Sequence, residues 1–457
     1  MRFQTVHTPT SLTEGPISQA LISFALPLLL GNLFQQLYNT ADSLIVGNFL
    51  GSEALAAVSS SGNLIFLMVG LVNGVSMGAG VVIARYFGAK DYDRIQKTIH
   101  TLLAFGLVAG ALLTVVGVAL SPVMLRLMDT PETVLPDSIS YFRTYFTGSL
   151  AFVLYNICMG ILQAVGDSRH PLQYLIISSL VNVVLDLLFV GVFHMGVWSA
   201  AAATAISQLV SMALCLLRLM RSERAYRVSL RKIRFDRRAL LEILQNGLPA
   251  GLQSVMYSLS NIIIQASVNG FGTDVMAAYT AYGKVDGMYW MVINAFGVAI
   301  TTFVGQNFGA RLYDRMKKSI NVCLGIAAAV TLLLSGVLMV VAEPLLGLFS
   351  DDAQVLEIGL SIVRLIVPTY ITYIFIEILS GAMRGAGDSL IPTIMTLTGV
   401  CLLRVFWVTV VVSAHHELNV LLLSYPITWI VTSGMFMVYY LRGRWLKRCI
   451  ALQNAEN

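Results

Sequence analysis

The hydrophobic residues of this chain come in long runs, such as those from Leu102 to Leu120 and from Leu324 to Val341. A helix rises 1.5 Å per residue, so about 20 apolar residues are enough to cross the hydrocarbon core of a bilayer. Turn residues and charges divide the chain into twelve such stretches, which begin near residues 17, 53, 98, 137, 171, 197, 239, 274, 319, 355, 390 and 418. The pattern predicts an all-α membrane protein with twelve transmembrane helices.

Positive charges between these runs are distributed very unevenly. Of the 29 Lys and Arg residues, 24 lie in the terminal segments and in the alternate loops that share their side of the membrane. The loops of the other side contain one, Arg126, and the remaining four lie within the predicted helices. Because Lys and Arg accumulate on the cytoplasmic side, we expect a multi-pass plasma-membrane protein, in a bacterium an inner-membrane protein, with both termini in the cytoplasm.

An internal repeat with an offset of 221 residues is the second regularity. The segment from Phe87 to Lys97, Phe-Gly-Ala-Lys-Asp-Tyr-Asp-Arg-Ile-Gln-Lys, returns from Phe308 to Lys318 as Phe-Gly-Ala-Arg-Leu-Tyr-Asp-Arg-Met-Lys-Lys. Other pairs at this offset are Gly51 and Gly272, Gly62 and Gly283, Asn73 and Asn294, Arg143 and Arg364, Pro171 and Pro392, and the Gly-Asp-Ser segments 166–168 and 387–389. One register held across six helices indicates a duplicated six-helix unit.

The duplication has consequences for the architecture. Six helices return the chain to its starting side, so the halves share one orientation and a pseudo-two-fold axis along the membrane normal. We expect 17–218 to superpose on 239–441 by a rotation of about 180°, with a central cavity between the two six-helix bundles. The predicted parts are a cytoplasmic N-terminal tail (1–16), the N-lobe (17–218), a basic cytoplasmic linker (219–238), the C-lobe (239–441) and a cytoplasmic C-terminal tail (442–457).

Composition narrows the class of protein further. Hydrophobic residues make up 57% of the chain and charged residues 12%, whereas an average soluble domain has about 25% charged residues. The net charge of +5 comes from short loops, so we expect no nucleic-acid partner. The five cysteines are far apart and lack the spacing of zinc sites, so we expect neither disulfides nor a zinc centre.

Four polar residues of the N-terminal half are candidates for a cation site. Asp42 lies in the first predicted helix, ~10 Å below its outer end. Asn182 and Asp186, at i and i+4, share one face of the fifth helix at a similar depth, and Thr204 reaches that depth in the sixth. Buried charges in a membrane are costly and usually functional. Carboxylate, amide and hydroxyl oxygens at one level suit Na⁺, and two neighbouring carboxylates also suit H⁺.

The alternative is that these four residues only hydrogen-bond the helices to one another, as polar groups in helical bundles often do. The internal repeat favours function. At the offset of 221 the positions of Asp42, Asn182, Asp186 and Thr204 become Ile263, Leu403, Trp407 and Tyr425. A purely architectural network would have survived duplication more evenly, so the site is specialised to the N-terminal half.

The C-terminal half has ionisable residues of its own, and they lie at other positions. They are Lys284 and Asp286 in the eighth predicted helix, Glu377 in the tenth and Arg404 in the eleventh. We expect Lys284 or Arg404 to pair with Asp286 or Glu377, because an unpaired charge at that depth is costly. Glu377 is also a candidate for substrate contact. Asp167 and Asp388 follow Gly in tight loops, where capping of the next helix is the simplest role.

Several of these motifs together resemble one family of transporters. Pro27, Asp42, the two Phe-Gly-Ala segments, Asn182 with Asp186, and the Arg-Gly-Ala-Gly-Asp loop at 384–388 are similar to the multidrug and toxic compound extrusion (MATE) family, in particular its DinF-like branch. The resemblance covers nearly the whole chain. It implies export of small organic, typically cationic compounds by alternating access, in exchange for H⁺ or Na⁺. It also implies that Asp42, Asn182, Asp186 and Thr204 form the cation site.

This sequence lacks two acidic residues that are typical of another branch of the family. NorM-like members have a glutamate in the seventh helix and an aspartate in the tenth. The matching segment of the seventh helix, 249–257, reads Pro-Ala-Gly-Leu-Gln-Ser-Val-Met-Tyr, and the tenth predicted helix has no Asp. We therefore expect no second Na⁺ site of the NorM type in the C-terminal half.

Other functions fit the sequence less well. No GxxxxGK[ST] motif occurs, so ATP is not the direct energy source. A lipid-linked sugar flippase has a similar repeat, but a strongly cationic cavity is typical of that class, whereas the helices here hold four acids and four bases. An intramembrane enzyme would need a nucleophile or a metal motif such as HExxH. We expect a transporter without a cofactor, whose partners are a small organic substrate and the bilayer, with no obligate protein partner.

Overall fold

The computed structural model describes residues 12–127 and 130–456, with the backbone alone at 52, 53, 55–57, 59–69, 71, 452 and 454–456. Every regular element in these ranges is helical. Packing divides the chain into two compact units, the first formed by Leu26–Gly251 and the second by Leu12–Ala25 and Leu252–Asn457. The units are connected through two helices, the first and the eighth, since each division falls inside a helix. The lobe limits 17–218 and 239–441, and their superposition, stay a prediction.

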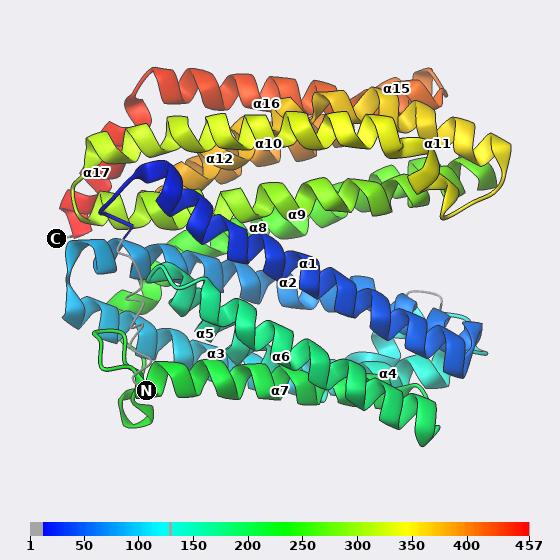
Figure 1. Cartoon of the computed structure of the whole chain (residues 1–457), viewed down its shortest axis with the longest axis horizontal. Coiled ribbons are helices and arrows are strands. Elements are labelled where there is room, and N and C mark those ends of the chain that lie inside the picture. Colours follow the sequence, from blue (N-terminus) through cyan, green and yellow to red (C-terminus); the bar gives the residue numbers. More distant parts are fainter. Residues whose placement is uncertain (1–11, 128–129, 457) are drawn as a thin grey trace, which may run out of the picture. The chain divides into compact units, whose positions relative to one another are not determined.

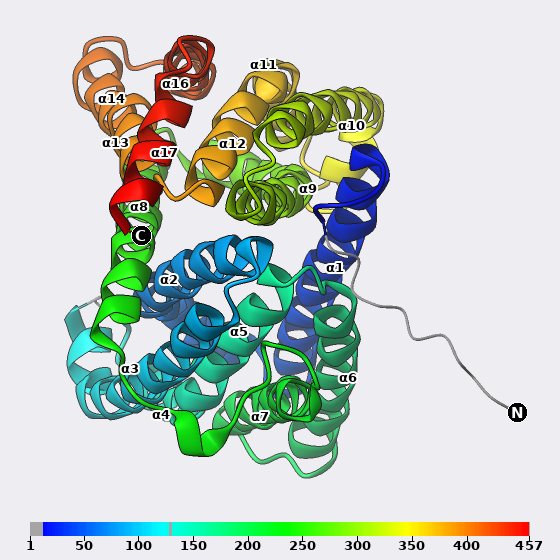
Figure 2. The ribbon, with the colours of Figure 1, turned by 90° about the vertical axis from the view of Figure 1, so that its left-hand side faces the viewer.

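The first six membrane-spanning segments (Figure 1) lie in unit 1, except that the start of the first helix, up to Ala25, belongs to unit 2. They are α1 (Ile17–Leu50), α2 (Ser52–Ala89), α3 (Tyr92–Leu127), the pair α4 (Leu135–Thr147) and α5 (Ser149–Ala164), α6 (Arg169–Asp186) with the π-helical turn η1 (Leu187–Val192), and α7 (Trp198–Arg221). Seen end-on, α5 lies among α2, α3 and α7 (Figure 2), and all three contact it. Its residues Val153, Ile157 and Ile161 are fully buried there.

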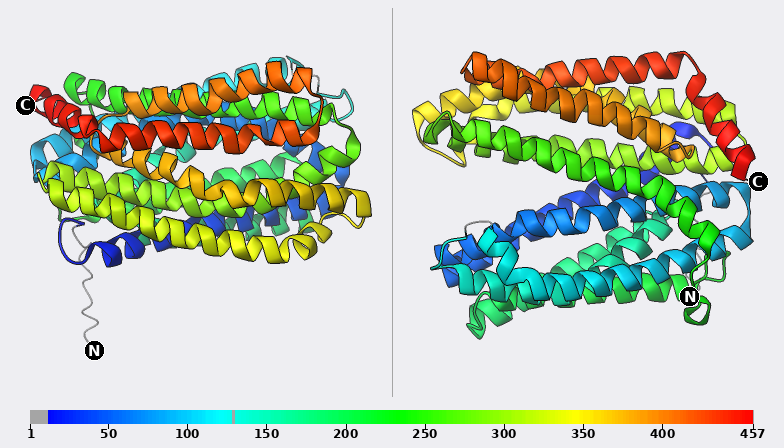
Figure 3. Two further views of the ribbon diagram at one scale, coloured as in Figure 1. Left: turned by 90° about the horizontal axis from the view of Figure 1, so that it is seen from above. Right: turned by 180° about the vertical axis from the view of Figure 1, so that it is seen from behind.

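The second six segments and a terminal helix lie in unit 2, except that the start of the eighth helix, up to Gly251, belongs to unit 1. They are α8 (Arg237–Asn269), α9 (Thr273–Gly309), α10 (Tyr313–Gly347), α11 (Ala353–Ile366) with η3 (Val367–Thr369) and α12 (Tyr370–Gly385), α13 (Leu390–Thr396) with η4 (Leu397–Leu402), α14 (Leu403–Phe406) and η5 (Trp407–Val412), α15 (Leu418–Leu422) with α16 (Ser424–Leu441), and α17 (Arg444–Glu456). Gly443, with φ of 64°, turns the chain from α16 into α17 (Figure 3).

The helices confirm the predicted twelve spans. Nine described helical segments are long and apolar enough to cross a membrane, and the pair α4 and α5, bent by 46°, forms a tenth. With 38 and 33 residues, α2 and α8 complete the set. Large apolar side chains on the outside, such as Val340 (82% exposed) and Leu333 (70%), explain the unusual composition, because lipid instead of water covers them.

The backbone repeats the register found in the sequence. Lys90 and Arg311, which are 221 residues apart, have φ of 57° and 59°. Both end a long helix in the left-handed conformation that often terminates helices. Gly166 and Gly387 form a second pair, with φ of 89° and 96°. The same unusual backbone conformation at matching positions shows that the two halves turn the chain in the same way.

Two pairs of glycines bring α2 and the start of α8 into backbone contact within unit 1. A Cβ atom on Gly78 would lie 2.3 Å from the backbone N of Gly247, and one on Gly74 would lie 2.3 Å from Cα of Gly251. Each helix thus presents glycines four residues apart, the spacing at which small residues let helices approach closely. This contact explains why α8 belongs to unit 1 as far as Gly251.

Candidate functional site

Helix α6 provides the most deeply buried polar residues of the candidate site. Asn182 and Asp186 lie on one face of α6, and neither side chain is exposed. Asp186 is the last residue of α6 and precedes the π-helical turn η1. In unit 2 a π-helical turn, η5, begins at Trp407, the residue that matches Asp186. The turn is therefore part of the repeated scaffold, and only the carboxylate is particular to unit 1.

Helices α1 and α7 complete the predicted set of four residues. The amide Nδ2 of Asn182 donates a hydrogen bond of 3.5 Å to Oγ1 of Thr204, which is also buried. Asp42 is half-buried on α1, and its carboxyl group lies close enough to that of Asp186 for the two to interact electrostatically. The structure thus brings Asp42 to Asp186 and Asn182 to Thr204, as the depths of these residues in the sequence predict.

This cluster has more negative charge and more hydrogen-bond acceptors than its neighbours can compensate. Two neighbouring carboxylates inside a membrane protein repel each other unless a proton or a cation neutralises one of them. Several buried oxygens at the cluster also accept no hydrogen bond from a described residue: Oδ1 of Asp42, Oδ1 of Asn182, both carboxyl oxygens of Asp186 and Oε1 of Gln208. Buried acceptors are normally satisfied. An excess of acceptors over donors fits a bound H⁺ or Na⁺.

The same cluster does not fit a transition metal. Among the described residues there is no group of three or more His, Cys, Asp or Glu side chains that could hold such an ion. All five cysteines are buried and free. The donor set consists of oxygen, which hard cations prefer.

Sequence reasoning missed part of the surroundings of the carboxyl pair. The hydroxyl of Tyr38 interacts with the side-chain amides of Gln35 and Gln208. The rings of Tyr141 and Tyr145 stack, with centroids 6.4 Å apart. Helical spacing could have identified these residues. Tyr38 lies one turn before Asp42 on α1, and Gln208 lies one turn after Thr204 on α7.

The matching positions of unit 2 show what the fold does without these polar groups. Ile263, Trp407 and Tyr425, which stand at the positions of Asp42, Asp186 and Thr204, all pack against one hydrophobic cluster. The indole N–H of Trp407 donates to the carbonyl of Val420, at 2.8 Å. At the same positions unit 1 carries two carboxylates and a small hydroxyl side chain. This contrast weighs against a purely architectural role for Asp42 and Asp186.

The predicted pairing of the C-terminal charges is wrong. The described residues contain no ion pair between Lys284 or Arg404 and either Asp286 or Glu377. Asp286 instead accepts hydrogen bonds from the hydroxyls of Tyr282 (3.0 Å) and Tyr370 (2.5 Å) and from the indole N–H of Trp290 (2.7 Å). Three neutral donors stabilise this carboxylate, and Arg404 interacts with it without forming an ion pair.

The other three ionisable residues of unit 2 have separate environments. Glu377 pairs with Arg384, two turns further along α12, with Oε1 and Nη2 3.8 Å apart. The guanidinium of Arg404 lies 4.4 Å from the ring centroid of Tyr425 and donates to Thr428 at 3.4 Å. Lys284 is exposed on α9. A cation over an aromatic face replaces the expected carboxylate partner of Arg404.

The two loop aspartates cap helices, as predicted. Oδ1 of Asp167 accepts from the backbone N–H of His170 (3.2 Å), and Oδ1 of Asp388 accepts from that of Ile391 (3.3 Å). Burial of Asp167 disfavours its charged form, but the hydrogen bonds from the ring (2.6 Å) and backbone of His170, with electrostatic attraction from His170 and Arg218, together outweigh burial and lower the pKa of Asp167 below its usual value. Asp388 also pairs with Arg448 of α17, at 2.7 Å. These residues hold loops and take no part in the carboxyl cluster.

Comparison with known proteins shows which class of protein has this fold. A solved structure of a MOP superfamily transporter from Pyrococcus furiosus has the same fold, with a TM-score of 0.89 over 97% of this chain and 98% of that chain, at 24% identity. The protein is thus a multi-pass helical membrane protein with the transporter fold. The sequence model of the MatE family matches residues 27–188 and again residues 249–410, once in each half of the repeat, so the chain belongs to the MatE family.

Two relatives cover much of the chain. The probable multidrug resistance protein YoeA of Bacillus subtilis is 29% identical over 437 residues, which are 94% of each protein. An FAD transporter of Shewanella oneidensis is 28% identical over 365 residues, 78% of this chain and 79% of that protein. The relatives are membrane transporters, and the family resemblance read from the sequence is confirmed.

Proposed function

We propose that this chain is an antiporter of the plasma membrane that exports small organic compounds by alternating access, driven by an inward flow of H⁺ or Na⁺. The observation that carries the proposal is the group of buried oxygens without donors on Asp42, Asn182 and Asp186, two of them neighbouring carboxylates. A proton or Na⁺ at this place would neutralise the repulsion between the carboxylates. Asn182 and Thr204 would supply the amide and hydroxyl oxygens of the same site.

Coupling requires that the cation and the substrate favour different conformations. Binding of a cation between Asp42 on α1 and Asp186 on α6 draws two helices of unit 1 together. If this arrangement disfavours the substrate-bound state, thermodynamic linkage requires that substrate binding also weakens cation binding. Release of the cation to the cytoplasm would then prepare the protein for the next substrate.

The substrate we propose is a small organic compound, in the first place a cationic one. Multidrug resistance proteins among the relatives support this class. The Shewanella relative is an FAD transporter, so a flavin nucleotide is the appropriate second substrate to assay. No cofactor, nucleic acid or obligate protein partner is part of the proposed cycle, and both termini would lie in the cytoplasm.

The experiment is transport by the purified chain in proteoliposomes. A pH gradient and a Na⁺ gradient are imposed separately, and uptake of a fluorescent organic cation and of a flavin nucleotide is followed in each. We expect accumulation of the organic cation against its gradient, driven by one of the two ion gradients. Uptake that only equilibrates the substrate would identify a passive channel. Lipid-linked sugar scrambling without ion dependence would identify a flippase.

A further inference from the structure

The linker between α7 and α8 is an ordered element that packs on unit 1. Nε2 of Gln96, on α3, donates to the carbonyls of Ala225 (2.5 Å) and Arg227 (3.0 Å). One turn further along α3, Nε2 of His100 accepts from the backbone N–H of Ser229 (3.1 Å). Nδ1 of His100 is 2.7 Å from the carbonyl of Gln96 and donates to it, which fixes the tautomer.

Two buried side chains of the linker pack into the hydrophobic core of unit 1. Tyr226 and Val228 are 3% and 2% exposed and belong to the hydrophobic core of unit 1. The ring of Tyr226 lies 6.5 Å from that of Phe87, between centroids. Near the start of α8, the backbone N–H of Asp236 donates to Oγ1 of Thr101, at 3.0 Å. The linker therefore presents a fixed outer face instead of a mobile loop.

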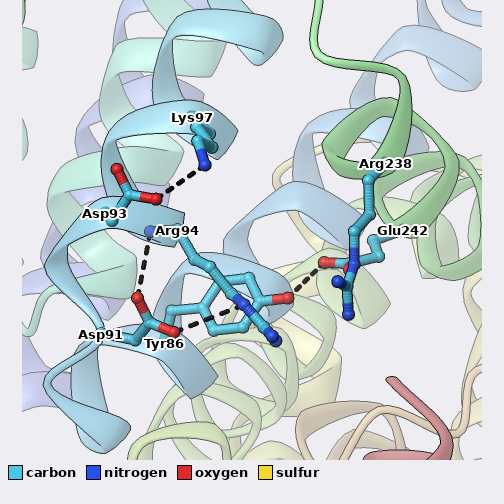
Figure 4. Close-up of polar contacts among 7 residues, drawn as sticks. All are labelled: Tyr86, Asp91, Asp93, Arg94, Lys97, Arg238 and Glu242. Carbon is cyan, nitrogen blue, oxygen red and sulfur yellow. Dashed lines mark hydrogen bonds and ion pairs between the residues drawn. The ribbon is translucent and has the colours of Figure 1, made fainter. Parts of the chain in front are cut away.

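That outer face, here called the linker surface, is strongly basic. Its exposed cationic residues are Arg221, Arg224, Arg227, Arg231, Lys232, Arg234, Arg237 and Arg238. In the described part of the chain, Arg238 is the member of this set that forms an ion pair, with Glu242 at 3.3 Å. Glu242 also accepts a hydrogen bond from the hydroxyl of Tyr86 (Figure 4). The same segment has two acids, the exposed Glu223 and Asp236, which caps α8 through Ala239 at 2.9 Å, so the basic residues clearly outnumber the acidic ones.

Two large apolar side chains are exposed on the same segment. Leu230 is 54% exposed and Phe235 is 50% exposed. Basic side chains next to exposed apolar ones are typical of segments that lie at a membrane interface. A topology signal alone needs only the charges. It requires neither ordered packing of the backbone nor outward-pointing Leu and Phe.

The position of the linker indicates that its binding partner is the lipid of one leaflet. The linker begins where α7 ends at Arg221 and ends where α8 begins at Arg237, so both of its ends lie at the same surface of the membrane. We propose that the linker surface binds anionic phospholipid headgroups of this leaflet, with Leu230 and Phe235 at the level of the headgroups. Arg and Lys side chains contact the phosphates, and the hydrogen bonds from α3 keep them facing the lipid.

Quenching by brominated lipids tests the proposal on the full chain. Phe235→Trp places an indole at the linker surface, and the fluorescence of the parent chain, with its five Trp residues, is subtracted. The protein is reconstituted with brominated phosphatidylglycerol or brominated phosphatidylcholine at equal mole fraction. We expect a several-fold preference for the anionic lipid at low salt that weakens at high salt, because salt screens exposed charges.

Matched variants identify the residues responsible. Changing Arg224, Arg227, Arg231, Lys232 and Arg234 to Gln in the Phe235→Trp protein should abolish the preference. Changing the exposed Arg442, Arg444 and Lys447 to Gln should leave it intact. Should the linker variant fail to reconstitute, the salt dependence of the Phe235→Trp protein decides by itself.

Three results would overturn the proposal. The first is equal quenching by the two lipids at low salt, which would leave the charges as a topology signal only. The second is a preference that survives neutralisation of the linker or addition of high salt. The third is loss of the preference on adding soluble inorganic phosphate at unchanged ionic strength, which would indicate a site for small anions.

Discussion

Nδ2 of Asn182 and Oγ1 of Thr204 lie 3.5 Å apart and join α6 to α7 one turn from Asp186. The bond uses a donor of Asn182 and leaves its Oδ1 without a partner among the described residues. The amide oxygen therefore stays buried and available as an acceptor, one turn before Asp186 on α6. One weak bond between two helices thus decides which end of the amide a cation would meet.

Removing the charge at position 42 should stop coupling. Asp42→Asn keeps the size of the side chain but removes the charge that a proton or Na⁺ would neutralise. We expect loss of gradient-driven export, with melting temperature and detergent elution close to those of the parent. Asp186→Asn should act similarly. Export is measured in vesicles at matched protein levels.

The control for these variants is Asp388→Asn, in the loop before α13. Asn still caps a helix, and the ion pair with the partly exposed Arg448 contributes ~1 kcal/mol at most. Export should therefore stay near the parent level. Parental export by Asp42→Asn would mean that this carboxylate is structural and that coupling lies elsewhere.

The orientation of the Asn182 amide can be tested through Thr204. Thr204→Val keeps the shape of the side chain but removes the hydroxyl that accepts from Asn182. A lost buried hydrogen bond costs about 1 kcal/mol, too little to unfold the protein. If Thr204 contributes to the cation site, the concentration of H⁺ or Na⁺ needed for half-maximal export should rise several-fold. An unchanged ion dependence with slightly lower stability would assign Thr204 a packing role.

Asp286 should be important for stability rather than for coupling. Asp286→Asn replaces one acceptor oxygen with an N–H₂ group, so a donor of Tyr282, Tyr370 or Trp290 loses its partner. We expect destabilisation of about 2 kcal/mol, seen as a lower melting temperature in detergent. The ratio of ion to substrate transported should not change. Loss of export by a variant of parental stability would instead point to a second coupling site in unit 2.

The glycine contact between α2 and α8 should not tolerate a methyl group. Gly78→Ala places Cβ 2.3 Å from the backbone of Gly247, so the helices must separate, at a cost of about 1–3 kcal/mol. Gly70→Ala, on the same helix, meets nothing within 4 Å and should be neutral or slightly stabilising, since Ala favours helix. Thermal unfolding of the two variants measures the difference. Equal melting temperatures would show that the contact is looser than the structure indicates.

The Asp167–His170 contact should make stability depend on acid pH. The pKa of Asp167 is lowered in the folded protein, so ionised Asp167 adds stability above its unfolded pKa of about 4. This contribution is lost as the pH falls through the still lower folded value. The melting-temperature difference between the parent and Asp167→Asn should therefore be largest at neutral pH and shrink below about pH 4. A difference independent of pH would show that the charge contributes nothing.

The sequence by itself determined the spans, the duplication and most of the proposed ion site. Transmembrane helices can be read from local hydrophobicity, because a bilayer demands about 20 apolar residues whatever the neighbours are. Asn182 and Asp186 share a face through helical periodicity alone, and depth along α1 and α7 brought Asp42 and Thr204 to the same level. The pair Glu377 and Arg384, seven residues apart on α12, was accessible by the same rule but was overlooked.

Only the tertiary structure decided which side chains of different helices meet. Asp286 receives the Tyr370 hydroxyl from α12, and Arg404 lies over the ring of Tyr425 from α16. The linker lies along α3 because Gln96 and His100 meet its backbone. Such contacts depend on how each helix is rotated and crosses its neighbours. Rotation and crossing are set by close packing over many residues, as between Gly78 and Gly247, and no local pattern of the sequence encodes them.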